Sequence, residues 1–276
     1  GVQGVQYDGH GGPWTRFGSP YIVTGDVEIP VGTTLTVEPG VTVLFETDAG
    51  IQVFGTLFAE STEPELPIRF TSGRANPGSG DWRGISFEPG SSGSLRNGAV
   101  EYAGSSGSWE HAGIVIDGTD EVSIRECVIR RNVSPTDSEK GWGIRIMNGC
   151  DPTVADSLLA GNGRGATGLD LDCFPVLSGN HANGNGRCNA HELHTGNVTR
   201  SGTWYADSVP YVLDDYSASS GNVVIEIGST LTVQPGTVVK MDYGAGEVSL
   251  NVSGELLAAG TDANPIVFTS AADDRM

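Results

Sequence analysis

The chain has 276 residues, 41 of them glycine, and its 34 acidic residues outnumber 15 lysines and arginines to give a net charge of −19. A nucleic-acid binder needs a basic face to replace phosphate counterions, so we expect no nucleic-acid partner. No apolar run approaches the roughly 20 residues of a membrane span, and no stretch keeps apolar residues at helical spacing for three turns. We therefore expect almost no helix and no membrane span.

A block of about 60 residues occurs twice along the chain. Thr34–Val43 and Thr230–Val239 have almost the same sequence, and the two copies close on the near-identical phrases Pro67–Ser72 and Pro265–Ser270. Upstream, both copies carry a tryptophan followed by a Pro-Tyr pair: Trp14 with Pro20-Tyr21, and Trp204 with Pro210-Tyr211. Within each copy, apolar and polar residues alternate between glycine turns, which predicts short strands with one buried face.

The middle of the chain, residues 80–190, has a shorter period. Four units begin with glycine and an apolar strand, with starts 29, 30 and 25 residues apart: Gly84–Phe87, Gly113–Ile116, Gly143–Ile146 and Gly168–Leu171. Each unit carries two further apolar strands. Three strands in each such unit are typical of a coil of a parallel β-helix, where each strand hydrogen-bonds to its equivalent one coil further on.

Alignment of these units produces two columns of polar or small residues. The first column falls at the bend between the second and third strands and contains Gly98, Cys127, Ser157 and Asn180. The second follows the third strand and contains Asn132, Asn162 and Asn185. We expect such residues there because buried bends leave little room and backbone groups that need hydrogen bonds.

On these features the chain resembles the right-handed parallel β-helix proteins of the pectate-lyase-like superfold, in particular repeat-rich bacterial secreted and surface proteins. The resemblance rests on Thr34–Gly40, Gly50–Val53, Pro67–Ser72, Gly80–Ile85 and Val122–Asn132. It implies an all-β, single-stranded solenoid of about nine or ten coils, right-handed as crossover connections usually are. It implies little about function, because this superfold hosts lyases, hydrolases, adhesins and phage spikes alike.

We expect one elongated domain over residues 1–276. It comprises a first repeat block at 13–72, middle coils at 80–185, an irregular connection at 186–210 and a second block at 211–276. In the first copy the closing phrase continues into another coil, whereas the second copy stops soon after it. We therefore expect either a piece of a longer parent or an end completed by a neighbour. The start at Gly1 is typical of a processed chain, and the resemblance implies a secreted or cell-surface location.

The four cysteines have the spacing of neither a zinc site nor a haem attachment motif. Cys150 and Cys173 share a column, and stacked coils lie about 4.8 Å apart, within the usual Cα separation of a disulfide. We predict a Cys150–Cys173 disulfide, with Cys173–Cys188 as the alternative. Cys127 is expected to point inward as a free thiol.

Charged residues suggest a site on the outer surface of the first strands. Asp117, Arg145, Asp170 and Asp172 form the best outward cluster, with the last two expected on alternate positions of one strand, roughly 7 Å apart. Two carboxylates so placed suit Ca²⁺ binding or inverting glycoside hydrolysis, and equally a solvated salt-bridge ladder with Arg145. Glu101 and Arg130 are expected to be neighbours in the same way, as are Arg145 and Asp170.

Aromatic and histidine residues give weaker indications. Trp82, Trp109 and Trp142 each precede a first strand and are expected either to stack on sugar rings or to pack over the coil ends. His191 and His194 have i, i+3 spacing, which is not the HExxH pattern of a metalloprotease, and we expect them in a polar loop.

The function that these features favour is an extracellular structural or surface protein. It would associate end to end through open β-helix edges, with its own copies or with adjacent segments of a longer parent. The alternative is a polysaccharide-binding or polysaccharide-degrading protein, a lyase or hydrolase, that uses the outer face of one sheet. The absence of a lysine near the aspartates weighs against a lyase. We lean towards a protein without enzymatic activity, and Ca²⁺ is the one cofactor considered.

Overall fold

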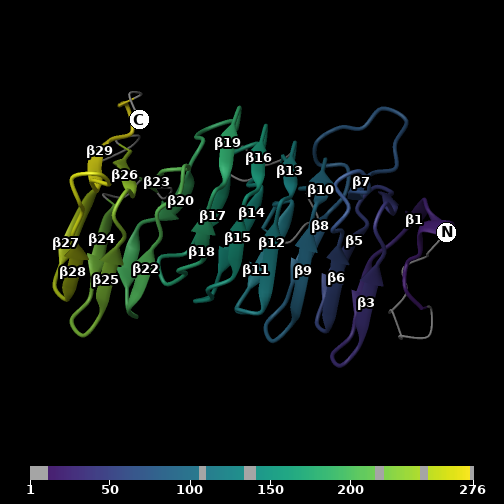
Figure 1. Ribbon diagram of the computed structural model, residues 1–276, viewed down its shortest axis with the longest axis horizontal. Helices are drawn as coiled ribbons and strands as arrows, with labels where there is room; N and C mark the ends of the chain where they lie inside the picture. The colour runs from purple at the N-terminus through teal and green to yellow at the C-terminus, as the bar shows by residue number, and fades with distance from the viewer. Residues whose placement is uncertain (1–11, 106–109, 134–140, 215–220, 243–247, 274–276) are drawn as a thin grey trace.

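The computed structural model describes residues 12–105, 110–133, 141–214, 221–242 and 248–273 (Figure 1). Short strands dominate these residues, and η1 at Arg16–Gly18, a single 3-10 turn, is the one helix among them. No helix in this part of the chain is long and apolar enough to cross a lipid bilayer.

The strands belong to five sheets. A ten-stranded sheet runs along the whole described chain and contains β2 (Val27–Ile29), β5 (Gly50–Val53), β8 (Gly84–Phe87), β11 (Ile114–Asp117), β14 (Ile144–Met147), β17 (Thr167–Leu169), β20 (His191–His194), β23 (Tyr211–Asp214), β26 (Val238–Met241) and β29 (Val267–Ser270). A seven-stranded sheet contains β1 (Tyr21–Val23), β4 (Thr42–Phe45), β7 (Ile68–Ser72), β10 (Gly98–Glu101), β13 (Val128–Arg130), β16 (Leu158–Ala160) and β19 (His181–Asn183). A six-stranded sheet contains β3 (Thr34–Val37), β6 (Thr56–Glu60), β9 (Ser92–Arg96), β12 (Val122–Arg125), β15 (Thr153–Ala155) and β18 (Val176–Ser178). Two three-stranded sheets contain β21 (Gly196–Val198), β24 (Asn222–Ile225) and β27 (Ser249–Val252), and β22 (Gly202–Trp204), β25 (Thr230–Val233) and β28 (Glu255–Ala258).

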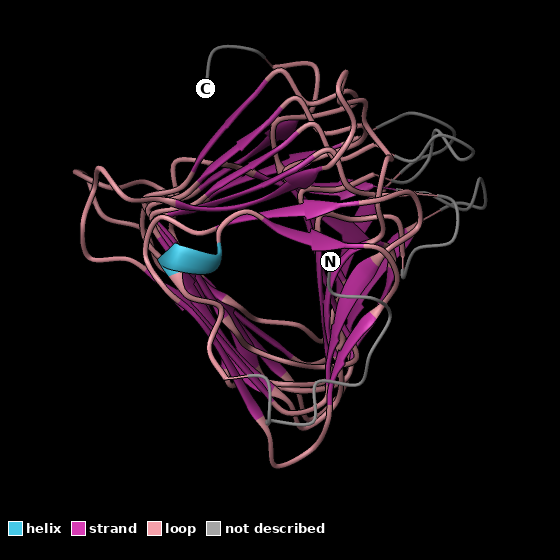
Figure 2. Cartoon of the chain, turned by 90° about the vertical axis from the view of Figure 1, so that its right-hand side faces the viewer, coloured by secondary structure: helices cyan, strands magenta, loops and turns pink. Residues whose placement is uncertain are grey.

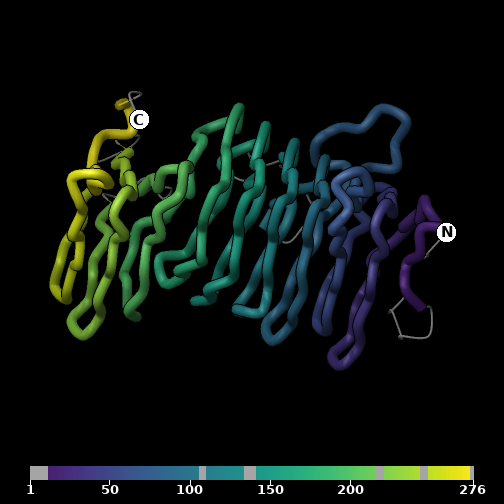
Figure 3. Tube along the Cα trace, in the orientation of Figure 1, coloured from purple at the N-terminus to yellow at the C-terminus, as the bar shows by residue number. Residues whose placement is uncertain are grey.

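All pairings between the described strands are parallel, and each joins a strand to the one three positions later. Figure 3 shows the chain advancing along the long axis from its N-terminal to its C-terminal end. Three consecutive strands therefore form one layer. We call β1–β3 the first layer and β27–β29 the last layer, and these lie at opposite ends of the long axis. The expected three-strand period is thus confirmed. The all-β, parallel arrangement is consistent with a β-helix-like fold.

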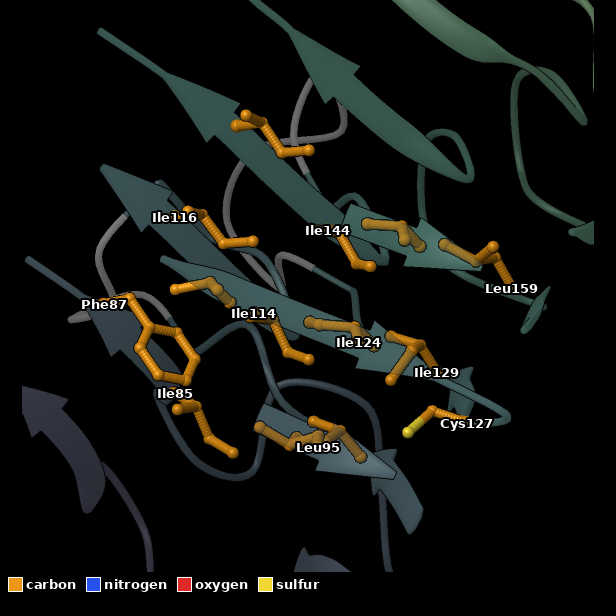
Figure 4. Packing of buried hydrophobic residues seen from close by; sticks show 14 of the residues in the cluster. Ile85, Phe87, Leu95, Ile114, Ile116, Ile124, Cys127, Ile129, Ile144 and Leu159 are labelled. Atoms are coloured by element: carbon orange, nitrogen blue, oxygen red, sulfur yellow. The ribbon is translucent and has the colours of Figure 1, made fainter. Parts of the chain in front are cut away.

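The sheets face a common apolar core, seen end-on in Figure 2. Alternate residues of each strand point into it, and equivalent residues of successive layers stack, as Ile85, Ile114 and Ile144 do in the ten-stranded sheet (Figure 4). These side chains join one continuous cluster in which most members are fully buried. Cys127 lies within this cluster as a free thiol, as predicted.

Both predicted columns are confirmed as hydrogen-bond ladders that run along the stack. At the first bend, the Cys127 N–H donates to Ser157 Oγ at 3.1 Å, and the Ser157 N–H donates to Asn180 Oδ1 at 3.1 Å. In the second column, Asn162 Oδ1 accepts from the Asn132 N–H and from Asn132 Nδ2, both at 3.1 Å. Asn185 Oδ1 likewise accepts from the Asn162 N–H at 2.9 Å and from Asn162 Nδ2 at 3.0 Å. Buried bends therefore satisfy their polar groups within the chain.

Charged side chains of neighbouring layers also pair as expected. Glu101 is fully buried between Arg69 and Arg130, and Arg130 Nη2 lies 2.7 Å from Glu101 Oε2. Burial acts to raise the pKa of Glu101, but the hydrogen bonds and positive charges of the two arginines outweigh it and hold the pKa below its usual value. The carboxylate therefore stays ionised and holds three strands of the seven-stranded sheet together.

The two copies of the repeated block form the same strands but in different sheets. Tyr21 begins β1 in the seven-stranded sheet, whereas its counterpart Tyr211 begins β23 in the ten-stranded sheet. β23 comes 22 strands after β1, which equals seven complete layers of three strands and one additional strand. The second copy is therefore displaced by one sheet around the core. The local packing is kept, since Trp14 stacks on Tyr21 at 5.2 Å and Trp204 on Tyr211 at 5.5 Å.

The stretch 186–210 is not simply irregular, and His191–His194 is not a loop; both expectations are corrected. The stretch contains β20, β21 and β22, and only the ten-stranded sheet passes through it unbroken. The buried His191 lies on the core side of β20, where Nε2 is 3.0 Å from Asp207 Oδ2. Burial acts to raise the pKa of Asp207, but hydrogen bonds from His191 and Asn180 lower it. Ordinary strand alternation, rather than a metal-binding pattern, explains the two histidines.

The four cysteines are free thiols, so the predicted disulfide is not formed in the structure. Cys150 and Cys173 nevertheless lie inside the core, close enough for each thiol to shift the pKa of the other. The interaction with Cys150 and burial both raise the pKa of Cys173, whereas the interaction with Cys173 lowers the pKa of Cys150 against the opposing effect of burial. Cys188 lies instead near Gly165 and the charged groups of Arg164 and Glu192. The contacts therefore favour Cys150–Cys173 over the alternative pairing.

Replacement of Asn162 by alanine should destabilise the protein strongly. The change leaves buried donors of Asn132 and the carbonyl of Ile129 without their partner, at a cost of about 2–4 kcal/mol in the free energy of unfolding. Urea unfolding followed by circular dichroism measures this difference. Asn183→Ala is the control, because Asn183 is exposed on β19, and it should change stability by less than about 0.5 kcal/mol. Equal effects of the two substitutions would contradict the ladder as a source of stability.

Oxidation of the folded protein by diamide should join Cys150 to Cys173. The diamide takes up the two thiol hydrogens as the sulfur–sulfur bond forms, and the two thiols lie close enough to shift each other's pKa. Peptide mapping without reductant should find these two cysteines linked and Cys127 free. Recovery of Cys150 in a free-thiol peptide after complete oxidation would disprove the pairing.

Candidate functional site

The predicted charged cluster on the outer face of the ten-stranded sheet is partly assembled. Arg145 forms an ion pair with Asp170, as expected. Asn148 connects this pair to Asp117, because its Nδ2 donates to Asp117 Oδ1 at 2.6 Å and its N–H donates to Asp170 Oδ2 at 3.1 Å. Asp172 is held separately by the Thr199 N–H at 2.7 Å. Three of the four predicted residues therefore form one network.

The expected placement of Asp170 and Asp172 on one strand is wrong. Gly168, not Asp170, pairs with Arg145, and β17 ends at Leu169. Asp170 follows the strand and Asp172 lies in the next turn. The register is shifted by two residues because the ring of Trp142 covers the outer face at Gly168, where a Cβ would come within 2.8 Å of the ring. Only glycine fits beneath the indole.

Trp82 and Trp142 do not offer open faces to a sugar ring, which corrects one of the two readings for these two residues. Trp82 is fully buried, stacks on Phe45 at 3.9 Å, and donates from Nε1 to the Glu101 carbonyl at 2.9 Å. Trp142 is 2% exposed. Trp109 lies outside the described residues. Trp82 and Trp142 are packing residues, the alternative that the sequence left open.

Beneath Trp142 lies a set of ionisable groups that the sequence did not reveal. We call Arg164, Arg187, Glu192 and Asp214 the buried ion cluster. Arg164 is fully buried, and it contacts Glu192 Oε2 at 2.7 Å and Asp214 Oδ2 at 2.5 Å. Arg187 lies 2.5 Å from Asp214 Oδ1, and Trp142 Nε1 donates to Glu192 Oε2 at 2.6 Å. Residues from successive layers therefore meet at one point.

The two carboxyl groups of the buried ion cluster behave differently. Burial acts to raise the pKa of Glu192, but Arg164 outweighs it and the pKa is lowered. Burial, together with the hydrogen bond and the negative charge of Glu192, raises the pKa of Asp214 to about 7. The pair thus resembles an acid and a base held together. Both side chains are sealed from solvent, at 0% and 1% exposure, so a substrate cannot reach them.

Two grooves open on the surface, and Arg187 of the buried ion cluster lines the second of them. One, of about 590 Å³, is lined by polar residues that include Asp170, Asp172, His194 and Asn197. Burial lowers the pKa of His194 to about 4, so the imidazole is neutral at ordinary pH. The other, of about 700 Å³, includes Arg187 and Asp242. Neither groove is lined by a phenylalanine, tyrosine or tryptophan.

The cation-binding reading of the aspartates finds no support in these contacts. The Asp170 carboxylate is already paired with Arg145 and hydrogen-bonded to the Asn148 N–H, and the Asp172 carboxylate accepts from the Thr199 N–H. Among the residues that the structure describes, no three His, Cys, Asp or Glu side chains converge as a metal site would require. The carboxylate oxygens instead hold neighbouring parts of the chain together.

The second exposed feature is the outer edge of the last layer, which we call the tail edge. Val252 and Phe268 point towards the core side of β27 and β29, yet they are 49% and 41% exposed. Their counterparts in the first copy, Val53 and Phe70, are 0% and 1% exposed, because the following layer covers them. The same holds for the following pairs, in which the first residue is buried and the second is not: Ile51 and Leu250, Leu57 and Leu256, Ala59 and Ala258, Ile68 and Ile266.

The corresponding outer edge of the first layer, the head edge, is covered. Its inward residues Val23, Ile29 and Leu35 are fully buried. Trp14 lies over this edge: its N–H donates to the Thr36 carbonyl and its carbonyl accepts from the Glu38 N–H, both at 2.9 Å. Trp14 pairs with β3 alone, so β1 and β2 remain the outermost strands of their sheets, but the inward side chains of the first layer are buried and those of the tail edge are not.

Substitution of Asp214 by asparagine should change how stability depends on pH. Folding raises the pKa of Asp214 from 3.8 to about 7, so its contribution to stability is complete below about pH 4 and is lost as the pH rises to 7. The free energy of unfolding of the variant, relative to the wild type, should therefore increase between pH 4 and pH 7. Urea unfolding at several pH values measures this difference. A difference independent of pH would contradict the assignment. The comparison with the wild type is needed because His194, with its lowered pKa, gives the opposite slope below pH 6.5.

Comparisons with known proteins add no family to this description. No protein-family model matches the chain, and no curated protein or solved structure matches it significantly.

Proposed function

We propose that the chain is a single-stranded, right-handed parallel β-helix that forms one elongated domain and acts as an extracellular or cell-surface structural protein. It associates with its own copies through the tail edge. The parallel pairing of every third strand supports the solenoid, and parallel crossovers are almost always right-handed. The contact between Cys150 and Cys173 suits an oxidising compartment outside the cell.

The observation that carries the proposal is the difference between matched positions of the two copies. The same residue types that are buried under a following layer in the first copy are exposed at the tail edge. An apolar edge with unpaired backbone groups is a template for another strand. The layer that covers the first copy, β8–β10, shows what fits there: parallel-sheet strands with inward aliphatic residues such as Ile85, Leu95 and Val100.

The polysaccharide-active alternative has less support. Sugar-binding sites commonly use exposed aromatic faces, whereas Trp82 and Trp142 are buried. The paired carboxyl groups of Glu192 and Asp214 are also buried. The polar groove beside Asp170 is the remaining feature in its favour, and its acidic lining suits neutral rather than acidic sugars.

A lysine introduced at the tail edge should weaken self-association. Val252→Lys places a charge where a covering layer would pack, and we expect the dissociation constant to rise at least about tenfold. Sedimentation velocity over a concentration series measures it. Leu257→Lys is the matched control, because Leu257 is equally exposed, at 46%, on the outward side of the same layer. A wild type that stays monomeric at its highest soluble concentration would refute the proposed function.

A further inference from the structure

Backbone pairing between layers changes once along the described strands, at residues 186–210, which we call the joint. Before the joint, all three sheets pass from one layer to the next. At the joint, β18 and β19 are the last strands of the six-stranded and seven-stranded sheets, and β21 and β22 begin the two three-stranded sheets. The ten-stranded sheet alone continues, through β17, β20 and β23. Because each layer is stabilised by its nearest neighbours, the backbone connection between the described layers is weakest at the joint.

Side chains form hydrogen bonds across the joint where strand pairing stops. Asp207 extends the first polar column across it, because Asp207 Oδ1 accepts from the Asn180 N–H at 2.9 Å and Asp207 Oδ2 accepts from Asn180 Nδ2 at 2.8 Å. Asp172 Oδ1 accepts from the Thr199 N–H at 2.7 Å. Two carboxylates therefore supply hydrogen bonds between the layers at the point where two sheets are interrupted.

The apolar core continues through the joint, and its packing there is tight. Gly202 of β22 lies against the buried ring of Phe174, and a Cβ added at Gly202 would come within 2.0 Å of that ring. Arg200 covers the same ring, with its Cζ 4.8 Å from the ring centroid. The contact leaves no room for a methyl group, so a single substitution at Gly202 disturbs the joint.

From these contacts we propose that the joint divides the stack into two units that open separately. The first unit comprises β1–β19 and the second comprises β21–β29. The hydrogen bonds of Asp172 and Asp207, the packing of Gly202 and the Arg164–Asp214 ion pair hold the units together, along with the ten-stranded sheet. Within each unit, three sheets connect neighbouring layers, so a unit opens as a whole, whereas the joint parts with the loss of one sheet's pairing.

Hydrogen exchange of the native protein tests the division. Exchange is followed by peptide mass spectrometry at several low concentrations of urea. As urea rises, the protected amides within each unit should converge on one free energy of opening, and the values of the two units should differ with a step at the joint. A profile without a step at the joint would overturn the division.

Two variants that insert the same methyl group distinguish the joint from the interior of a unit. Gly93→Ala acts inside the first unit, because a Cβ at Gly93 would come within 2.5 Å of the Leu57 carbonyl oxygen. It should speed exchange of the protected amides of the first unit at least about tenfold and leave the second unit unchanged, since the second unit opens without the first. Gly202→Ala weakens the joint, whose contacts are lost whichever unit opens, so it should speed exchange in both units by a similar factor.

The variants also define what would contradict the proposal. Equal acceleration of all protected amides by Gly93→Ala would show that the stack opens as one unit. Unchanged exchange on both sides of the joint in Gly202→Ala would show that this contact does not hold the units together. If neither variant folds, the exchange profile of the wild type still decides whether a step lies at the joint. The inference concerns contacts inside one copy, so its failure leaves the proposed function untouched.

Discussion

Each layer of this protein depends on its neighbour for a hydrophobic core. A layer consists of three short strands whose inward side chains, such as Val53 and Phe70, are buried only when the next layer lies above them. The backbone follows the same rule, since every strand finds its hydrogen-bond partners three strands away and none within its own layer. Stability is therefore built along one axis, between nearest neighbours. The properties of the two ends follow directly, because an end layer has a neighbour on one side only.

Stacking also governs where polar residues can be buried. At the bends, the chain turns away from the regular strand pairing, and its amide groups need other acceptors. The asparagine ladder supplies them, because each side chain accepts a hydrogen bond from the backbone of the preceding layer. The Asn132 N–H donates to Asn162 Oδ1, and the Asn162 N–H donates to Asn185 Oδ1. A shift of register would break every rung at once. The ladders thus add specificity to an apolar core that tolerates sliding more easily.

Features that repeat along the axis could be predicted from the sequence, because a repeat leaves a period. The strands, both polar columns, the Glu101–Arg130 pair and the neighbourhood of Cys150 and Cys173 are of this kind. Features that occur once could not. The two-residue shift of register at Gly168 depends on where the ring of Trp142 lies. The sequence of this unit, which begins with Gly168-Leu169 like the units before it begin with Gly-Ile, does not indicate the shift. The meeting of Arg164 with Glu192 and Asp214 joins residues with no common spacing, although the outward positions of the two acids follow from strand alternation.

These unpredicted contacts lie where the fewest sheets continue from one layer to the next. Around residues 186–210 the seven-stranded and six-stranded sheets end, the three-stranded sheets begin, and only the ten-stranded sheet carries its hydrogen bonds across. The buried ion cluster lies on the outer face of that sheet, and the His191–Asp207–Asn180 network lies on its inner side. Buried charges are costly to desolvate and are retained where removal of one partner would leave another unpaired. Here Arg164 extends from the loop after β16 to acids on β20 and β23, one and two layers further on. Backbone hydrogen bonds cross residues 186–210 in the ten-stranded sheet alone, and the ion pairs of Arg164 cross the same region. These ion pairs therefore help to connect the second copy of the repeat, which carries the tail edge, to the preceding layers.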